Sequence, residues 1–249
     1  MKETRTDIMG MPITVEIAEP FATENDLRSV FDYLGAVDAR FSPFKTDSEV
    51  SRINRGELKG TDYSPEMKTV LKLAEETKED TNGYFDILRP DGKMNPSGLV
   101  KGWAIFEAAE NLRVAGFQNF YINAGGDIEA RGMNYSGQPW RLGIENPFKV
   151  EETVRVVHLT DRGIATSGTA RRGDHIYEPH DPKQKLSEIV SISVVGPNVY
   201  EADRFATAVF AMGRAGIEFL EQEPGLEGYM IDKDGMATMT SGFNEYTHD

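Results

Sequence analysis

The sequence of 249 residues contains no cysteine and is short of basic side chains. Without cysteine the protein has no disulfide bond, no thiolate metal site and no cysteine nucleophile. Lysine and arginine number 27 against 41 aspartate and glutamate residues, which gives a formal net charge of −14. Because nucleic-acid binding depends on clustered positive charge, this balance argues against a nucleic-acid partner.

Long apolar runs are also missing from the sequence, so no membrane span is expected. The first ten residues, MKETRTDIMG, hold neither an apolar run nor a cleavage pattern. We therefore expect a cytoplasmic protein, with a mature exported form whose signal was removed as the alternative. No low-complexity linker divides the chain, and residues 1–249 are expected to form one compact domain.

The spacing of apolar residues predicts more strands than helices. Strands are expected at residues 13–17, 119–124, 141–147, 153–159, 163–168 and 189–196. Helices are expected around residues 27–34, 65–78, 101–114, 202–212 and 216–221. The strands are clustered and do not alternate strictly with helices, which favours an α+β fold with mixed or antiparallel sheets and flanking helices over a doubly wound sheet.

The most informative segment covers residues 95–127, NPSGLVKGWAIFEAAENLRVAGFQNFYINAGGD. A glycine-containing turn opens a helix with Lys101 near its start, and a second glycine turn follows an apolar strand. Main-chain N–H groups at a helix start, together with an ammonium group, suit an anionic ligand such as a pyrophosphate. A glycine turn beside a solvated lysine explains Gly98, Lys101 and Gly102 equally well, because short glycine motifs recur by chance.

A second candidate site comes from Asp203 and Thr207, which stand four residues apart in EADRFATAVFAMG. On a helix this spacing places a carboxylate and a hydroxyl on one face, and such oxygen ligands suit magnesium. The residues alone favour a simpler interpretation, in which the aspartate complements the helix dipole and the threonine packs in the core.

Four histidines are candidates for a general base. His158 lies in an apolar strand and is interpreted as structural, and His248 lies in the terminal tail. His175 and His180 remain. With no partner evident in the sequence, each is explained most simply as a hydrogen-bonded loop histidine.

Seven blocks of the sequence, in order, resemble the ApbE family, the FAD:protein FMN transferases. They are MGMPITVEI, FSPFKTDSEVSRIN, GYFDI, SGLVKGWAIFEAAENLRVAGFQNFYINAGGDI, GIATSG, HIYEP and EADRFATAVFAMG. The resemblance runs from about Met9 to about Gly213 and implies a two-lobed α+β fold.

The resemblance also implies roles for individual residues. Magnesium would be bound by Asp203, Thr207 and the main-chain carbonyl of Gly98. His175 would be the catalytic base, with a shifted alignment onto His180 as the alternative, and Lys101 would help to neutralise the pyrophosphate of FAD. The implied contacts with FAD are Met9, Phe44, Tyr84, Phe85, Asp86, Asn95, Lys101 and Ile176.

Three positions depart from the family pattern. Asn95 stands where the family usually has aspartate, and Phe44 stands where tyrosine or asparagine is common. Glu178 replaces the aspartate of the His-Ile-x-Asp-Pro element. An amide keeps a hydrogen-bond acceptor but loses the charge, and phenylalanine can stack but cannot donate a hydrogen bond.

The activity implied by the resemblance is transfer of FMN from FAD to a threonine hydroxyl of an acceptor protein, with magnesium as cofactor and release of AMP. The alternatives are hydrolysis of FAD to FMN and AMP at the same site, and a FAD-binding protein without turnover. Either adjacent arginine, Arg171 or Arg172, could assist, although adjacent loop arginines are more often solvated.

Overall fold

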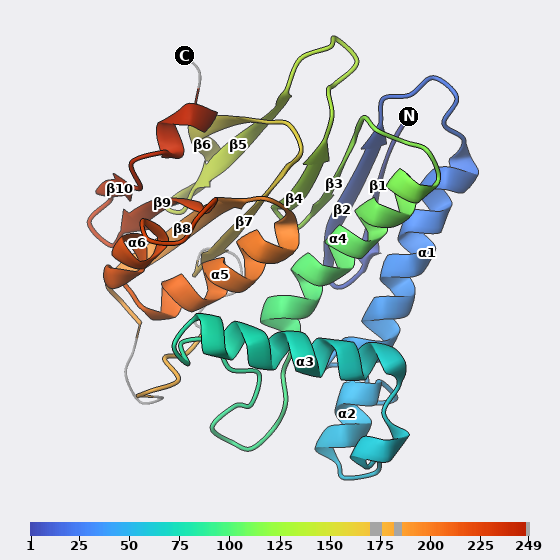
Figure 1. Ribbon diagram of the computed structural model, residues 1–249, viewed down its shortest axis with the longest axis vertical. Helices are drawn as coiled ribbons and strands as arrows, with labels where there is room; N and C mark the ends of the chain where they lie inside the picture. Colours follow the sequence, from blue (N-terminus) through green and yellow to red (C-terminus); the bar gives the residue numbers. More distant parts are fainter. Residues whose placement is uncertain (170–175, 182–185, 248–249) are drawn as a thin grey trace.

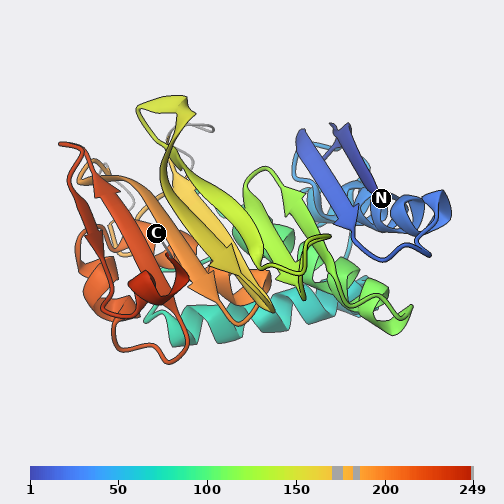
Figure 2. The same ribbon diagram turned by 90° about the horizontal axis from the view of Figure 1, so that it is seen from above.

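An antiparallel sheet of eight strands forms the framework of the protein, as the computed structural model shows for residues 1–169, 176–181 and 186–247 (Figure 1). Its strand order is β1-β2-β3-β4-β7-β8-β9-β10, and every neighbouring pair is antiparallel. The strands are β1 Lys2–Ile8, β2 Met11–Ile17, β3 Phe120–Ala124, β4 Asp127–Arg131, β7 Arg162–Gly168, β8 Ile189–Gly196, β9 Glu227–Asp232 and β10 Ala237–Met239. Figure 2 shows this order as a progression from the blue strands at one end to the red strands at the other.

Helices cover one face of the sheet in two groups. The helices are α1 Glu24–Phe41, α2 Glu49–Asn54, α3 Pro65–Asp80, α4 Ser97–Val114, α5 Val199–Ala211 and α6 Ala215–Leu220, with short 3-10 helices η1 Gly60–Asp62 and η2 Phe243–Tyr246. One core packs α1, α3 and α4 against β1, β2 and β3, and a second packs α5 and α6 against β7, β8 and β9. Helices α4 and α5 contact each other, so the two groups meet near the centre of the sheet.

The opposite face of the sheet carries an antiparallel ribbon, formed by β5 Trp140–Asn146 and β6 Lys149–Leu159. Trp140, Ile144 and Val157 of this ribbon pack against Ile128 and Ile164 of the sheet in a third apolar core. Among the residues described, no helix combines the length and apolar character needed to cross a membrane.

Local sequence features explain where the helices beside the site begin. Ser64 accepts a hydrogen bond from the Met67 N–H at 3.1 Å, and Pro65 occupies the first turn of α3. The side chain of Asn198 accepts from the Glu201 N–H at 2.9 Å at the start of α5. Side-chain oxygens at such positions satisfy main-chain donors that have no partner inside the helix.

The predicted α+β class is confirmed, and all six predicted strands are present. The helix expected at residues 101–114 begins at Ser97, so the prediction that Gly98 lies in a turn before the helix is wrong. Helix α4 is buried around most of its circumference, and its apolar spacing therefore gives little indication of its ends. The strands β1, β4, β9 and β10 and the helix α2 were not expected from the pattern.

Candidate active site

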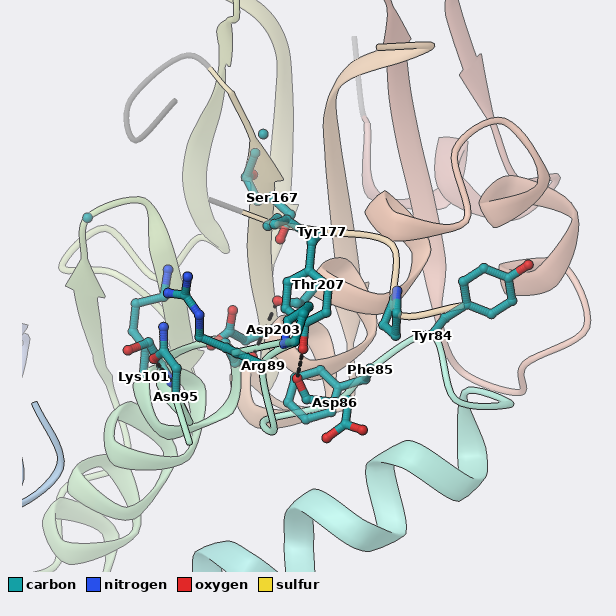
Figure 3. A pocket seen from close by; sticks show the side chains of 18 of the residues that line it. Tyr84, Phe85, Asp86, Arg89, Asn95, Lys101, Ser167, Tyr177, Asp203 and Thr207 are labelled. Carbon is teal, nitrogen blue, oxygen red and sulfur yellow. Dashed lines mark hydrogen bonds between the residues drawn. The ribbon is translucent and has the colours of Figure 1, made fainter. Parts of the chain in front are cut away.

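Two adjoining cavities lie where α4, α5 and the loop after α3 meet the sheet. The first has a volume of about 410 Å³, and its wall includes nearly all of the residues in Figure 3. The second, of about 890 Å³, lies beside the β1–β2 turn and the end of α1. Arg89, Asn95, Ser97 and Lys101 line both cavities, so the two form one continuous site. Their volumes are in the range of small-molecule and cofactor sites.

The floor of the first cavity is the contact between α4 and α5. The Thr207 hydroxyl lies 3.3 Å from the Gly98 carbonyl oxygen and donates to it. The Gly102 N–H donates to Asp203 Oδ2 at 2.8 Å. These contacts bring together three oxygen-containing groups from two helices: the Gly98 carbonyl, the Asp203 carboxylate and the Thr207 hydroxyl.

This close approach requires glycine at residue 102 and leaves little room for a larger residue at 98. A Cβ atom at residue 102 would lie 2.6 Å from the Cβ of Asp203 and 2.8 Å from the Val199 carbonyl oxygen. A Cβ at residue 98 would lie 3.2 Å from the Thr207 hydroxyl oxygen. The predicted grouping of Gly98, Asp203 and Thr207 is thus present in the structure, with Asp203 only 4% exposed.

Lys101 is held by a buried carboxylate. Its ammonium group forms an ion pair with Asp127, the first residue of β4, and the Asp127 side chain is 1% exposed. The second carboxylate oxygen, Asp127 Oδ1, accepts from the Thr166 N–H at 3.1 Å. Lys101 therefore enters the cavity in a fixed position and with its charge partly compensated. Figure 3 shows Lys101 beside Asn95, at some distance from Tyr84.

The wall opposite α4 comes from residues that follow α3. Phe85 is 3% exposed and its ring would lie 3.5 Å from a Cβ placed on Gly98. The Asp86 carboxylate forms an ion pair with Lys78 at 2.7 Å and accepts from the Leu88 N–H at 2.7 Å. These contacts fix the main chain of the predicted FAD-binding segment at the cavity wall.

Tyr177 closes the same wall from another part of the chain. Its hydroxyl donates to the main-chain oxygens of Asp86 and Leu88 at 3.0 and 3.1 Å. Burial is the largest cause of the raised pKa of Tyr177, which is about 12, and the nearby Asp86 carboxylate contributes to the same shift. Its neighbour Ile176 also lines the cavity, as predicted. Tyr177 therefore remains a neutral hydrogen-bond donor across the physiological pH range.

Asn95 has a structural role at the beginning of α4. Its side-chain oxygen accepts from the Ser97 N–H at 3.2 Å, and its own N–H donates to the Ile87 carbonyl oxygen at 2.7 Å. An amide performs this task without adding negative charge beside a site for an anion. The residue thus joins the wall segment to the first turn of α4.

The larger cavity contains the two remaining predicted contacts, Met9 and Phe44. Met9 lies in the turn between β1 and β2 with a φ of 54°, a left-handed conformation that is uncommon outside glycine. Phe44 is 90% exposed at the rim of the cavity. An exposed aromatic ring at the entrance is suited to covering a planar ligand, because burial of its surface would then accompany binding.

The two histidines considered as the general base differ in whether the structure describes them. His175 lies outside the residues that the structure describes, as do Arg171, Arg172 and His248. His180 packs edge-on against Tyr84 with ring centroids 4.6 Å apart, and its Nε2 lies 3.1 Å from the Asn82 carbonyl oxygen. His180 is absent from the described cavity linings, which argues against it as the base.

Glu178 and His158 have structural surroundings. Glu178 is 7% exposed and accepts from the His180 N–H at 2.8 Å, which stabilises the turn after Tyr177. His158 lies on β6 opposite Arg141 of β5, away from both cavities, as its interpretation as a structural residue requires.

A second buried carboxylate, that of Glu129, is hydrogen-bonded to the start of α5. Glu129 of β4 is fully buried, and its Oε2 accepts from the Val199 N–H, at the first residue of α5, at 2.6 Å. Its other oxygen forms an ion pair with Arg131 at 2.7 Å. Burial raises the pKa of Glu129 to about 7, and the opposing effects of Arg131 and the Val199 N–H only partly reverse this.

Several residues of the site were not evident from the sequence. Asp127 and Arg89 received no role, and Thr166 and Ser167 were considered only as part of a strand. Asp127 directly follows the Gly125–Gly126 turn, which was the only indication of its position in the sequence. Its pairing with Lys101 joins α4 to β4 and could not be derived from the spacing of residues along the chain.

The sequence is similar to those of known proteins over most of its length. The model of the ApbE family matches residues 9–90 and 88–230. The FAD:protein FMN transferase of Escherichia coli K12 is 31% identical over 177 residues, which cover 68% of this chain and 50% of that protein. That of Haemophilus influenzae is 25% identical over 277 aligned positions, covering 85% of this chain and 80% of that protein. The chain spans about half the length of the Escherichia coli relative.

Solved structures show the same fold. The flavin transferase ApbE from Vibrio cholerae superposes with a TM-score of 0.84 and 23% identity, covering 99% of both chains. The ApbE protein from Thermotoga maritima superposes with a TM-score of 0.89 and 17% identity, covering 100% of this chain and 99% of that one. Since the family model covers most of the sequence, the chain belongs to the ApbE family.

Proposed function

We propose that this protein transfers FMN from FAD to a threonine hydroxyl of an acceptor protein and releases AMP. The observation that carries the proposal is the grouping of the Gly98 carbonyl, Asp203, Thr207 and Lys101 in one cavity, which continues into a larger cavity with an aromatic rim. The smaller cavity would hold the pyrophosphate, and the larger one has room for a ring system. The names of the curated relatives support this assignment.

The donor set fits magnesium. All three donors are oxygens, and only one is charged, which suits a cation that keeps several waters and is completed by substrate phosphates. In the described part of the chain, no three His, Cys, Asp or Glu side chains gather into a metal cluster. A cation here would therefore be held by the mixed set of Gly98, Asp203 and Thr207. When bound, magnesium would supply positive charge to the pyrophosphate during transfer.

The protein residues would orient the pyrophosphate for in-line attack. The oxygen of the acceptor threonine forms a bond to the phosphorus on the FMN side of FAD. The bond from that phosphorus to the bridging oxygen breaks, and AMP leaves with the bridging oxygen. Lys101, fixed by Asp127, stabilises the negative charge on the non-bridging oxygens. Arg89 lines both cavities and is placed to add a second positive charge.

The proton of the threonine hydroxyl has to be removed as the new bond forms. We assign this role to His175. The family resemblance places His175 in this role, and the ring of His180 is already in contact with the Asn82 carbonyl and Tyr84. These contacts support His175 over the alternative alignment.

One assay tests the proposal against its alternatives. The protein is incubated with FAD, magnesium chloride and the proteins of a strain that lacks flavin transferases. AMP release and protein-bound flavin are then measured. Transfer predicts AMP together with a protein whose mass has risen by that of the FMN group. AMP with free FMN would indicate FAD hydrolysis. FAD binding without AMP would indicate a binding protein and would contradict the proposal.

A further inference from the structure

Strand β7 extends beyond its partner β4 at the edge of the candidate active site. The last paired residues of this ladder are Ile164 of β7 and Ile128 of β4. On its other side, β7 stays paired with β8 as far as Gly168. Among the residues described, no strand pairs with the end of β7 on the β4 side. The result is a short open edge at Thr166–Gly168.

Side chains prevent β4 from extending this ladder. In the same register the next hydrogen-bonded pair would join Thr166 to Gly126, but the Thr166 N–H donates to Asp127 Oδ1 at 3.1 Å. The Gly126 N–H donates instead to Asn123 Oδ1 at 2.9 Å. Gly125 and Gly126 have φ angles of 62° and 104°, so the chain turns away from β7 at this point. Both donors that would close the edge are therefore already used.

The main-chain groups beyond this point are directed away from β8. In a strand, the N–H and C=O of successive residues point alternately to the two neighbours. The Thr169 N–H donates to the Val190 carbonyl oxygen, at the start of β8, at 3.2 Å, whereas the Thr166 N–H points to the β4 side. The Thr166 carbonyl and both main-chain groups of Gly168 accordingly face the open edge.

A cavity lies on each side of this edge. Gly125, Thr166 and Gly168 line both the active-site cavity and a separate cavity of about 150 Å³ below the β5–β6 ribbon. The lining of the smaller cavity is mixed: Ile128, Leu142, Ile144, Ile164 and Val190 contribute apolar surface, and Asn123, Glu145, Asn146 and Ser191 contribute polar groups. Ser167 lines only the active-site cavity, and Figure 3 shows it near Thr207 and Tyr177.

We propose that the acceptor protein binds as an extended segment along the open edge of β7 at Thr166–Gly168. Alternate side chains of an extended segment point to opposite faces. The threonine to be modified would point into the active-site cavity, and the residue beside it would occupy the small cavity. The volume of about 150 Å³ therefore limits the size of the side chain next to the threonine. This inference rests on the proposed transfer to a protein acceptor.

The absence of cysteine allows a direct test. In Leu142→Cys the new thiol is the only one in the chain, and it lines the small cavity. Modification with N-phenylmaleimide should fill the cavity and lower the rate of transfer by about tenfold or more, with FAD affinity within about twofold. Arg141→Cys is the matched control, because Arg141 is exposed on the same strand and does not line this cavity. Comparing each variant before and after modification removes any effect of the substitution on folding.

The acceptor is the protein that wild-type enzyme labels covalently with flavin in extracts of the strain without flavin transferases. It is purified and used for all rates. Tryptophan placed directly before or after its modified threonine should also lower transfer by about tenfold, because neither position would fit the small cavity. Unchanged transfer by modified Leu142→Cys, or by the tryptophan acceptors, would overturn this inference. Failure of the wild type to label any protein would instead contradict the proposed function.

Discussion

Replacement of Glu129 by glutamine is expected to change how the free energy of unfolding depends on pH. Glu129 is fully buried beneath the first residue of α5, and burial raises its pKa from 4.5 to about 7. Between these two values the folded protein binds a proton that the unfolded chain releases. The wild type therefore loses stability from this group as the pH rises from 4.5 to about 7, and the loss is complete above pH 7.

The size of this effect follows from the shift. One pKa unit corresponds to about 1.4 kcal/mol, so the full change is about 3 kcal/mol, of which about 2 kcal/mol falls between pH 5.5 and 8. Glutamine is neutral at every pH and keeps an oxygen that can accept from the Val199 N–H. The stability of Glu129→Gln relative to the wild type should therefore increase by about 2 kcal/mol over this range.

Urea unfolding of both proteins at several pH values between 5.5 and 8 measures the difference directly. Glu151→Gln, at an exposed position on β6, is the control for loss of one negative charge. If the free energies of unfolding of Glu129→Gln and the wild type depend on pH in the same way, the pKa of Glu129 is the same in the folded and unfolded protein. Arg131 would then compensate fully for the loss of water around the carboxylate. The reasoning from burial would then be refuted.

Three further predictions concern the chemistry of the site. Asp203→Ala should abolish transfer at every magnesium concentration, whereas the rate of Thr207→Val should be partly restored by raising the magnesium concentration. Rates across a magnesium titration, with melting temperatures as a control for folding, show whether Asp203 binds the metal or only stabilises the start of the helix. His175→Ala should slow transfer by about a hundredfold to ten-thousandfold with FAD affinity nearly intact, and His180→Ala should do much less; the reverse order of rates would assign the base to His180. Asp127→Asn removes a buried negative charge beside Lys101 and should tighten FAD binding without magnesium, as measured by calorimetry; weaker binding would show that the charge is needed to position the lysine.

Local sequence patterns predicted those helices and strands that have one apolar and one polar face. Helix α3 has a serine cap, a proline in its first turn and buried residues at helical spacing, so its limits were nearly correct. Strand β1 has the sequence KETRTDI, whose mostly polar side chains give no apolar alternation, and its position depends on pairing with β2. The start of α4 depends on the Asn95 side chain and on burial against neighbouring elements, which the spacing of its apolar residues does not reveal.

The same distinction applies to the site. The spacing of four between Asp203 and Thr207 places both on one face of a helix, which is a local property, but only the family resemblance indicated that they bind a metal. Asp127 and Arg89 reach the cavity from a strand and a loop, and their neighbours there are set by the tertiary fold. The open edge of β7 arises from hydrogen bonds across three strands, and no sequence motif predicted it.

The direct contact of α4 with α5 at Gly102 also determines how the site can change. A methyl group at this position would meet the Cβ of Asp203 and the Val199 carbonyl, so neither helix can move closer and any larger side chain would force them apart. The distance between Lys101 and the oxygens of Gly98, Asp203 and Thr207 is thus fixed by main-chain contact. Changes in ligand size or in the choice of acceptor therefore have to arise in the surrounding loops, such as the one that carries Phe44. The contact between α4 and α5 thus keeps the centre of the site rigid, and the choice of ligand or acceptor can change only through the loops around it.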